Sequence, residues 1–279
     1  MNPNSLPLIR IAERLRGSSR IASAAVTLPP LALIVWIGSP WFTVLVAALA
    51  AVGAVEMCGM ARRWGDRPYT RVAVLWAVAF VVAGHIVDSD SSLAWALPIV
   101  SIAAAISVVS MLWCHGSGTR LSSWGVTTGA ALYTGGLLFH APLLRDLDQG
   151  LQWVVLLLFV TFVGDTCAFL VGRAIGRRPL APSISPSKTW EGAIGGLLGA
   201  LGASAAAVVL LDLDAGIGQA LSLGVLMGTV GPLGDLVESR LKRIAGVDNS
   251  GWLVPGHGGV LDRLDSIVFN LVVVYYFVS

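Results

Sequence analysis

The chain has 279 residues, of which 56% are hydrophobic and only 12% are charged. A typical soluble domain carries about 25% charged residues, so the composition excludes an ordinary soluble protein and indicates one that crosses a membrane several times. The formal net charge of +2 does not indicate nucleic-acid binding, because the basic residues are unevenly distributed. The three cysteines lack metal-ligand spacing and are predicted to be small apolar helix residues.

The first 20 residues form a basic segment, with arginines at positions 10, 14, 16 and 20. Small residues precede the next apolar stretch instead of following it, which is the wrong order for a cleaved signal peptide. We therefore predict a cytoplasmic interfacial segment over residues 1–20. A single polytopic membrane domain is predicted over residues 21–279, with its catalytic motifs in residues 164–266.

Nine apolar stretches follow in chain order, each near the ~20 residues that a helix needs to cross a bilayer. They cover residues 21–38, 41–61, 70–87, 92–113, 122–144, 151–172, 189–211, 216–238 and 260–278. The sequence thus predicts an all-α integral membrane protein with about nine transmembrane helices. We see no internal repeat and no low-complexity linker.

The basic residues support this number of spans. With the N-terminus in the cytoplasm and nine crossings, seventeen of the eighteen lysines and arginines fall in cytoplasmic segments, and only Arg145 does not. The external turns carry aspartates instead. This split is what the positive-inside rule predicts, and a missed span would disturb it.

The carboxylates of Glu56, Asp165 and Asp235 lie within predicted spans. Ionisable residues there are costly and are functional candidates by default. Asp165 and Asp235 each lie beside a glycine-rich polar segment, which favours a functional role. For Glu56 the sequence leaves two readings open, a functional carboxylate or one that pairs with a nearby arginine.

The motif "SISPSKTWEGAIGG", residues 183–196, opens the seventh span. A helix N-terminus offers free N–H groups and the positive end of the helix dipole, so it suits a phosphate. Lys188 and Arg173 could add positive charge. The alternative is a simple helix cap with basic residues that reach the membrane surface. The motif does not match the Walker A pattern, so a P-loop ATPase is not indicated.

The block over residues 238–266 concentrates charge at the start of the last span. On a helix, Asp235, Ser239 and Lys242 share one face, as do Asp262 and Asp265. Asp235 and Asp262 thus lie at the cytoplasmic ends of consecutive helices. They are predicted to be oxygen ligands for Mg²⁺, which favours a few carboxylates plus substrate phosphates.

Basic residues and glycines complete this block. Lys242, Arg243 and Arg263 could neutralise a polyphosphate, and glycines at 256, 258 and 259 allow backbone to approach a ligand closely. The alternative is a loop whose basic residues contact anionic lipid heads. That alternative explains the basic residues but not the two carboxylates among them.

The motifs together resemble one family. "SRLKR…PGHGGVLDRLDS" is similar to the signature of the phosphatidate cytidylyltransferases, also called CDP-diacylglycerol synthases. "SPSKTWEGAIGG" and "GDTCAFLVGRAIGR" resemble that family's two preceding motifs, and "LYTGGLLFHAPLLR" and "EMCGM" are weaker matches. The resemblance covers about the last 150 residues well and the first 120 mainly by span pattern.

This resemblance implies a multi-pass enzyme of the inner membrane, a homodimer, that uses Mg²⁺. It would join CTP and phosphatidate into CDP-diacylglycerol and pyrophosphate at a site facing the cytoplasm. The motifs imply that Asp235 and Asp262 are the leading metal ligands. The implied catalytic residues are Asp235, Asp262, Lys242, His257 and Arg263. Ser239, Arg243 and Asp265 would line the substrate site, Ser185, Lys188, Thr189 and Glu191 would form its other wall, and Asp165 and Arg173 are further predicted substrate-binding residues.

One pair of residues departs from the family pattern. The family usually has Lys-Asp where this chain has Asp248-Asn249, so a basic residue has become acidic and a carboxylate has become an amide. The departure leaves a different lipid phosphate as substrate, or an inactive paralogue, as alternatives. A transporter is a further alternative, because membrane carboxylates and helix ends also form transport sites near mid-membrane.

Overall fold

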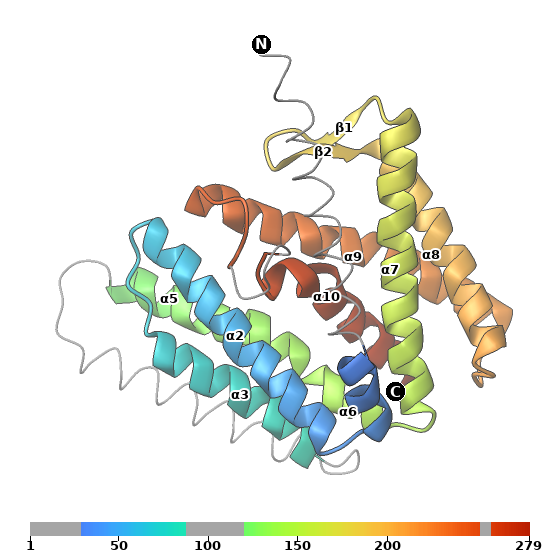
Figure 1. Cartoon of the computed structure of the whole chain (residues 1–279), viewed down its shortest axis with the longest axis horizontal. Coiled ribbons are helices and arrows are strands. Elements are labelled where there is room, and N and C mark those ends of the chain that lie inside the picture. Colours follow the sequence, from blue (N-terminus) through green and yellow to red (C-terminus); the bar gives the residue numbers. More distant parts are fainter. Residues whose placement is uncertain (1–28, 88–119, 252–257) are drawn as a thin grey trace, which may run out of the picture.

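A computed structural model describes residues 29–87, 120–251 and 258–279 of the chain. Residues 29–37 are helical, and the remaining elements are mostly helices (Figure 1). In chain order these are α2 (Trp41–Arg63), α3 (Thr70–Ile86), α5 (Arg120–Ala131), the π-helix η2 (Leu132–Gly136), α6 (His140–Asp146), α7 (Gly150–Ile175), β1 (Pro179–Ala181), β2 (Ser185–Thr189), α8 (Trp190–Leu210), α9 (Ile217–Ala245) and α10 (Leu261–Val278).

Four described helices are long and apolar enough to cross a membrane, namely α2, α7, α8 and α9. The chain is therefore a helical, multi-pass membrane protein. The predicted first span lies partly outside the described residues. The predicted fourth span and the N-terminal basic segment lie wholly outside them, so the total of nine spans and the direction of the N-terminus stay predictions.

The described helices begin and end at two ends of the molecule. At one end, here called the site end, α2, α7 and α9 finish and α8 and α10 begin. At the other, the far end, Ser39 Oγ donates to Asp146 Oδ1 at 2.8 Å. There too the Gln149 side chain bonds the backbone of Asp212 and Asp214 at 3.0 and 2.9 Å. Which of these two ends faces the cytoplasm stays a prediction.

The predicted span over residues 122–144 differs from a single α-helix. It consists of α5, η2 and α6 in succession. A Cβ at Gly135 would lie 2.4 Å from Ala77 Cα, so η2 packs with its backbone against α3. Pro142 in α6 has no N–H to donate to the preceding turn. The π-turn therefore coincides with the close approach of η2 to α3, and such turns often lie near functional sites.

A second difference is a small antiparallel hairpin of β1 and β2 at the site end, in a protein predicted to be all-α. It joins α7 to α8 and pairs Pro179 with Thr189 and Ala181 with Ser185. Prolines at 179, 182 and 186 disfavour helix in this region. The predicted span begins at residue 189 and α8 begins at Trp190, so the start of this helix is predicted to within one residue and the hairpin is the unpredicted element.

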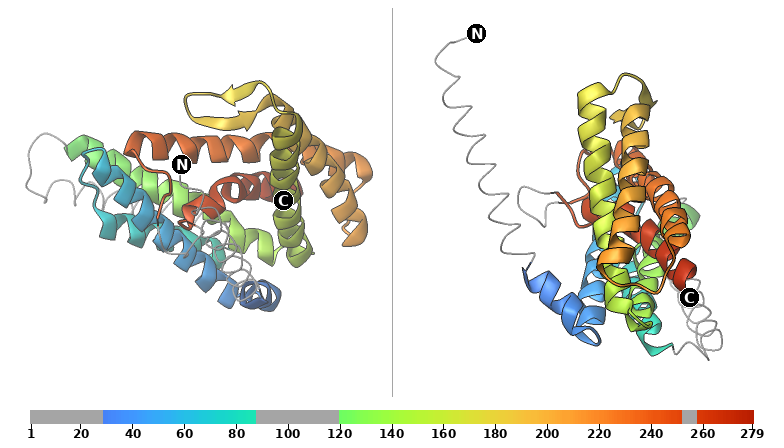
Figure 2. Two further views of the ribbon diagram at one scale, coloured as in Figure 1. Left: turned by 45° about the horizontal axis from the view of Figure 1, so that its top comes forward. Right: turned by 90° about the vertical axis from the view of Figure 1, so that its right-hand side faces the viewer.

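Helices α7 and α8 pack together along a seam of small residues, and they form one long hairpin in Figures 1 and 2. A Cβ at Gly195 would lie 2.6 Å from Val171 Cβ, and one at Gly199 would lie 2.7 Å from Cys167 Cβ. Glycines at these positions let the two backbones approach closely, as small residues do in membrane helix pairs.

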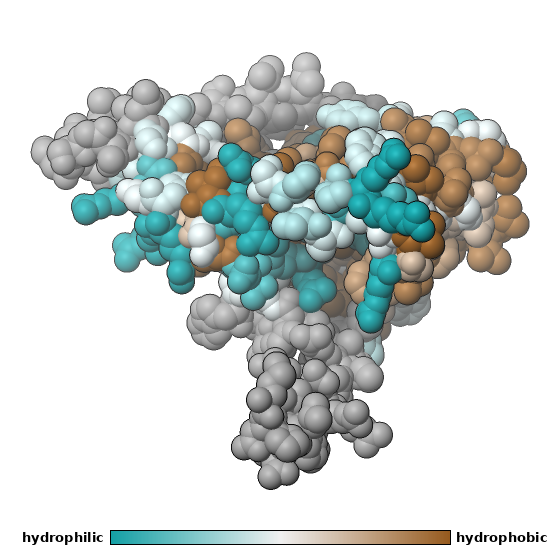
Figure 3. All heavy atoms as spheres, turned by 90° about the horizontal axis from the view of Figure 1, so that it is seen from above, coloured by the Kyte–Doolittle hydropathy of each residue, from teal (hydrophilic) through white to brown (hydrophobic). Residues whose placement is uncertain are grey.

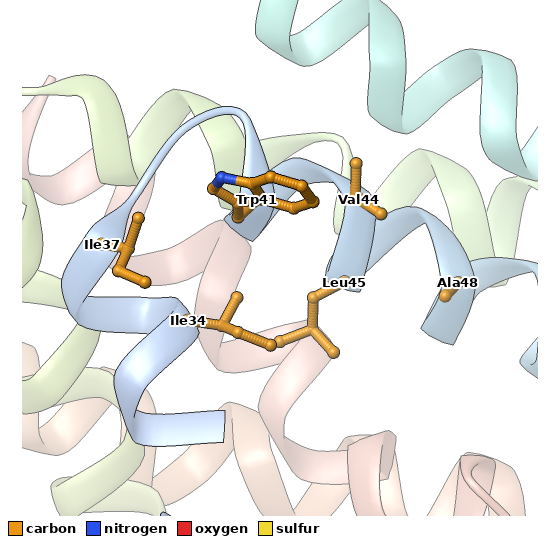
Figure 4. A pocket seen from close by; sticks show the side chains of 6 residues that line it. All are labelled: Ile34, Ile37, Trp41, Val44, Leu45 and Ala48. Atoms are coloured by element: carbon orange, nitrogen blue, oxygen red, sulfur yellow. The ribbon is translucent and has the colours of Figure 1, made fainter. Parts of the chain in front are cut away.

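The surface divides by polarity. Seen from the end that carries the β-hairpin, hydrophilic residues gather across the face and hydrophobic residues cover its right-hand side (Figure 3). A separate apolar hollow is lined by Ile34, Ile37, Trp41, Val44, Leu45 and Ala48 (Figure 4). It lies at the far-end start of α2, and its side chains offer no charged group, so the candidate site must be sought elsewhere.

Candidate active site

Three carboxylates from α9 and α10 meet at the core of the site. Asp235 and Glu238 lie on one face of α9, and Asp265 lies in the second turn of α10. One oxygen from each lies within 4.8 Å of the other two. The two helices approach closely here, since a Cβ at Gly234 would lie 2.4 Å from the Asp265 carbonyl oxygen.

Two lysines bring positive charge into this acidic cluster. Lys188 Nζ, at the end of β2, lies 2.5 Å from Asp235 Oδ2. Lys242 Nζ, on α9, lies 2.6 Å from Glu238 Oε2 and 2.7 Å from Asp262 Oδ1. The lysines therefore join the β-hairpin, α9 and α10 into one network of charges.

Glu238 is the most deeply buried member, with an exposed fraction of 0%. Its Oε2 contacts Lys242, whereas its Oε1 has no hydrogen-bond partner in the described part of the chain. A buried oxygen without a partner is costly. Hard carboxylate oxygens of this kind are the ligands that Mg²⁺ prefers, so Asp235, Glu238 and Asp265 fit a divalent cation.

Asp262 has a different environment from the other carboxylates. Its Oδ2 accepts the backbone N–H groups of Ser250 at 3.0 Å and Gly259 at 2.8 Å, while Oδ1 contacts Lys242. Both oxygens thus have protein partners. Asp265, rather than Asp262, lies beside Asp235, so the structure differs here from the predicted pairing of Asp235 with Asp262.

The predicted opposite wall is built from the hairpin and the start of α8. Ser185 lies on β2, and the Thr189 hydroxyl accepts the Gly192 N–H at 3.1 Å as the cap of α8. Glu191 Oε2 accepts the backbone N–H groups of Arg177 and Arg178 at 3.1 and 3.2 Å. Thr189 and Glu191 therefore have structural bonds, and Lys188 is the member of this motif that reaches the acidic cluster.

The remaining predicted residues surround this core. Ser239 Oγ donates to Asp235 Oδ1 at 3.2 Å, as the shared helix face predicts. Asp165 on α7 interacts electrostatically with Asp235 and Lys188. Arg173 lies exposed in the last turn of α7, and Arg263 is exposed on α10. His257 lies outside the described residues.

Arg243 forms an ion pair with Asp248, one of the two residues that depart from the family pattern. Its Nη1 donates to Asp248 Oδ1 at 3.1 Å, and its Nε donates to the Ile184 carbonyl at 3.3 Å. Both members of the ion pair are exposed. A cation expected to bind polyphosphate is thus partly neutralised by the aspartate at position 248.

Sequence reasoning missed Glu238 and Ser250. Glu238 carries a usable signal, because it lies three residues after Asp235 and four before Lys242 and therefore shares their side of the helix. Ser250 carries no such signal, since it lies in a loop. Its contacts with Asp262 depend on how that loop returns to α10.

These features describe a multi-pass helical membrane protein with a charged, partly buried site at one end of its helices. The model of the "Cytidylyltransferase family" matches residues 18–279. "Phosphatidate cytidylyltransferase 5, chloroplastic" of Arabidopsis thaliana is 34% identical over 88% of this chain and 67% of its own length. The "Phosphatidate cytidylyltransferase" of Brucella suis is 33% identical over 87% of this chain and 86% of its own length.

A relative in Bacillus subtilis, also named "Phosphatidate cytidylyltransferase", is 38% identical over 56% of this chain. That match spans 58% of the relative, which is less than two thirds of its length. The family match nevertheless extends over nearly the whole chain. The chain belongs to the cytidylyltransferase family, and it is a nucleotidyltransferase.

Proposed function

We propose that the protein is a phosphatidate cytidylyltransferase, which condenses CTP with phosphatidate to CDP-diacylglycerol and pyrophosphate in phospholipid biosynthesis. The observation that carries the proposal is the cluster of Asp235, Glu238 and Asp265 with Lys188 and Lys242 at one end of the helices. Anionic and cationic groups interleaved in this way suit a reaction between two phosphate compounds. The family membership of the chain supports the same reaction.

The chemistry requires mainly positioning and charge neutralisation. An oxygen of the lipid phosphate monoester attacks the α-phosphorus of CTP, a new P–O bond forms, and pyrophosphate leaves with the electrons of the broken bond. A phosphate monoester is largely ionised near neutral pH because its second pKa is about 6. A dedicated base is therefore unnecessary, and His257 serves as a polar contact or proton acceptor.

Asp235, Glu238 and Asp265 would hold Mg²⁺, which when bound neutralises phosphate oxygens of the nucleotide. The unpartnered Oε1 of Glu238 supports this set of ligands. Asp262, which the sequence favoured as a ligand, has one oxygen that already accepts two backbone N–H groups, from Ser250 and Gly259. We therefore place Asp265 ahead of Asp262 in the metal site and give Asp262 the role of orienting Lys242.

Lys188 and Lys242 are the cations nearest the carboxylates, and we propose that they exchange these contacts for phosphate oxygens when substrate binds. Ser239 and Asp165 line the same space, and Arg173, Arg243 and Arg263 supply charge around it. Ser185, Thr189 and Glu191 hold the hairpin and the start of α8 in place. Together they would orient the two phosphates for reaction.

The protein would lie in the inner membrane. Its site end would face the cytoplasm, because most basic residues lie in the segments predicted to be cytoplasmic. CTP would then arrive from the cytoplasm and phosphatidate from the bilayer. The protein would act as a homodimer and would not bind nucleic acid. Native mass spectrometry of the detergent-solubilised protein tests the oligomeric state.

The proposal predicts pyrophosphate release from the purified protein only when CTP, Mg²⁺ and phosphatidate are all present. The lipid product should carry the cytidylyl group, which mass spectrometry of the extracted lipid detects. If pyrophosphate is released with another lipid phosphate but not with phosphatidate, that other lipid is the substrate. No release with any lipid phosphate would favour the inactive paralogue.

The second candidate function is a cytidylyltransferase that uses a different lipid phosphate or has a weaker activity. The ion pair between Arg243 and Asp248 favours this candidate. Replacing Asp248 with alanine should lower the KM for CTP, because Arg243 would become free to contact phosphate. An exposed ion pair contributes about 0–1 kcal/mol, so we expect a decrease of no more than about fivefold. Steady-state kinetics measures this change.

The matched control for that variant is Asp214→Ala, which removes an exposed carboxylate at the far end and changes the net charge equally. If both variants lower the KM for CTP to the same extent, overall charge explains the effect. Arg243 would then have no specific contact with the nucleotide.

A further inference from the structure

Glu56 on α2 reaches across the molecule to the start of α10. Its Oε1 accepts the Val260 N–H and its Oε2 accepts the Leu261 N–H, each at 3.0 Å. These are backbone donors at the beginning of a helix, which no earlier turn of that helix can satisfy. Glu56 is buried, with an exposed fraction of 8%. Within the described residues, both of its oxygens bind backbone N–H groups and no ion pair joins it to a basic side chain.

Ser250 links Glu56 to the carboxylates of the site. Its Oγ lies 3.1 Å from Glu56 Oε2 and 3.0 Å from Asp262 Oδ2, so the hydroxyl can donate to either one. The Ser250 N–H also donates to Asp262 Oδ2. Asp262 in turn contacts Lys242, which contacts Glu238. A continuous chain of bonds therefore runs from α2 to the acidic cluster.

Two glycines make room for the Glu56 carboxyl group. A Cβ at Gly251 would lie 2.2 Å from Glu56 Oε1, and a Cβ at Gly259 would lie 2.6 Å from Glu56 Oε2. Any larger residue at these positions would have to displace the carboxyl group or the loop. The described residues on either side of residues 252–257 thus pack around a side chain from a helix about 200 residues earlier in the chain.

We propose that Glu56 is a positioning residue for the reaction, which fixes the first turn of α10 so that Asp262 and Asp265 reach their partners on α9. This inference rests on the proposed cytidylyltransferase activity. Glu56 contacts neither the acidic cluster nor Lys242 through its own side chain in the bonds described above. Its effect passes through Ser250 and the backbone of α10.

Glu56→Gln tests this role, because the amide keeps the size of the side chain but turns its NH2 group toward one of the two backbone donors. Partners that orient metal ligands typically change metal affinity or activity by about 10- to 100-fold. We expect kcat to fall by that factor and the Mg²⁺ concentration for half-maximal rate to rise, with a smaller change in the KM for CTP. Hydrogen exchange of the amides of Val260 and Leu261 should become faster.

Gly251→Ala perturbs the same contact while Glu56 stays intact, and it should reproduce the loss of kcat and the faster exchange. Gly202→Ala is its control, since a Cβ at Gly202 would meet no atom within 4 Å. Ser204→Ala controls for the loss of a buried hydrogen bond as such. Its hydroxyl donates to the Ala220 carbonyl at 2.7 Å, and it lies about 20 Å along α8 from Glu191.

The outcomes separate the two proposals. A wild-type protein without turnover would refute the proposed activity. Turnover in the wild type, with unchanged kcat and unchanged exchange in both Glu56→Gln and Gly251→Ala, would refute the positioning role. The positioning role would also be refuted if Ser204→Ala and Glu56→Gln lost the same thermal stability and also lost the same fraction of kcat.

Discussion

Replacing Asp265 with asparagine is expected to lower kcat by at least about 100-fold. The amide keeps the size of the side chain but removes one of the three negative charges that face one another in the acidic cluster. Changes to residues that only orient metal ligands already alter affinity or activity by about 10- to 100-fold, so a direct ligand should matter at least as much. Pyrophosphate release at a series of Mg²⁺ concentrations measures both the rate and the requirement for the metal.

Asp262→Asn in the same assay decides between the two sets of ligands. If Asp265 binds the metal, Asp265→Asn should raise the required Mg²⁺ concentration more than Asp262→Asn does. The reverse order would restore the pairing of Asp235 with Asp262 that the sequence predicted. Asp148→Asn, in the turn before α7, serves as a control for the loss of a carboxylate outside the site.

Replacing Lys242 with methionine is expected to lower the free energy of unfolding by about 3–5 kcal/mol. Lys242 lies between Glu238 and Asp262, whose side chains have exposed fractions of 0% and 11%. Removing one partner of a buried ion pair leaves charge without compensation, and the usual penalty is of this size. Thermal or denaturant unfolding of the purified protein in detergent measures the change.

A second substitution tests the cause of that loss. Lys242→Met combined with Glu238→Gln should recover much of the stability, because one of the two uncompensated carboxylates is then gone. Arg243→Met is the matched control, since its pair with Asp248 is exposed and contributes about 0–1 kcal/mol. Equal losses in Lys242→Met and Arg243→Met would contradict the importance of burial.

The helical membrane architecture and the ends at which the charged motifs lie could be predicted from the sequence. Long apolar stretches require helices, because the bilayer offers no partners for backbone N–H and carbonyl groups. The shared helix face of Asp235 and Ser239 also follows from spacing alone, and the structure confirms it with a direct hydrogen bond. These results depend only on local periodicity.

Contacts between distant segments could not be predicted in this way. Spacing shows that Asp262 and Asp265 share a face of α10, but not which of them turns toward Asp235. That choice depends on how closely the backbones approach at Gly234, where a side chain would meet the Asp265 carbonyl oxygen. The role of Glu56 depends on the loop before α10, and nothing in the local sequence of α2 indicates that loop.

The hairpin of β1 and β2 was missed for a different reason. The predicted span already begins at residue 189, but strands of three and five residues are too short to give a hydrophobic pattern of their own. The prolines nearby disfavour a helix, and Thr189 marks its start through the bond from the Gly192 N–H. A cap residue of this kind is visible in the sequence, but several neighbouring serines could have served equally well.

The glycine seam between α7 and α8 has a mechanical consequence. Backbones in such close contact cannot rotate past one another, because side chains such as Val171 and Cys167 already fill the space that each glycine leaves. The two helices must therefore move as one lever during any rearrangement. Asp165 on one arm and Lys188 at the base of the other therefore keep a nearly constant separation. Helix α9 shares this constraint, because a Cβ at Gly224 would lie 2.8 Å from Leu201 Cα on α8.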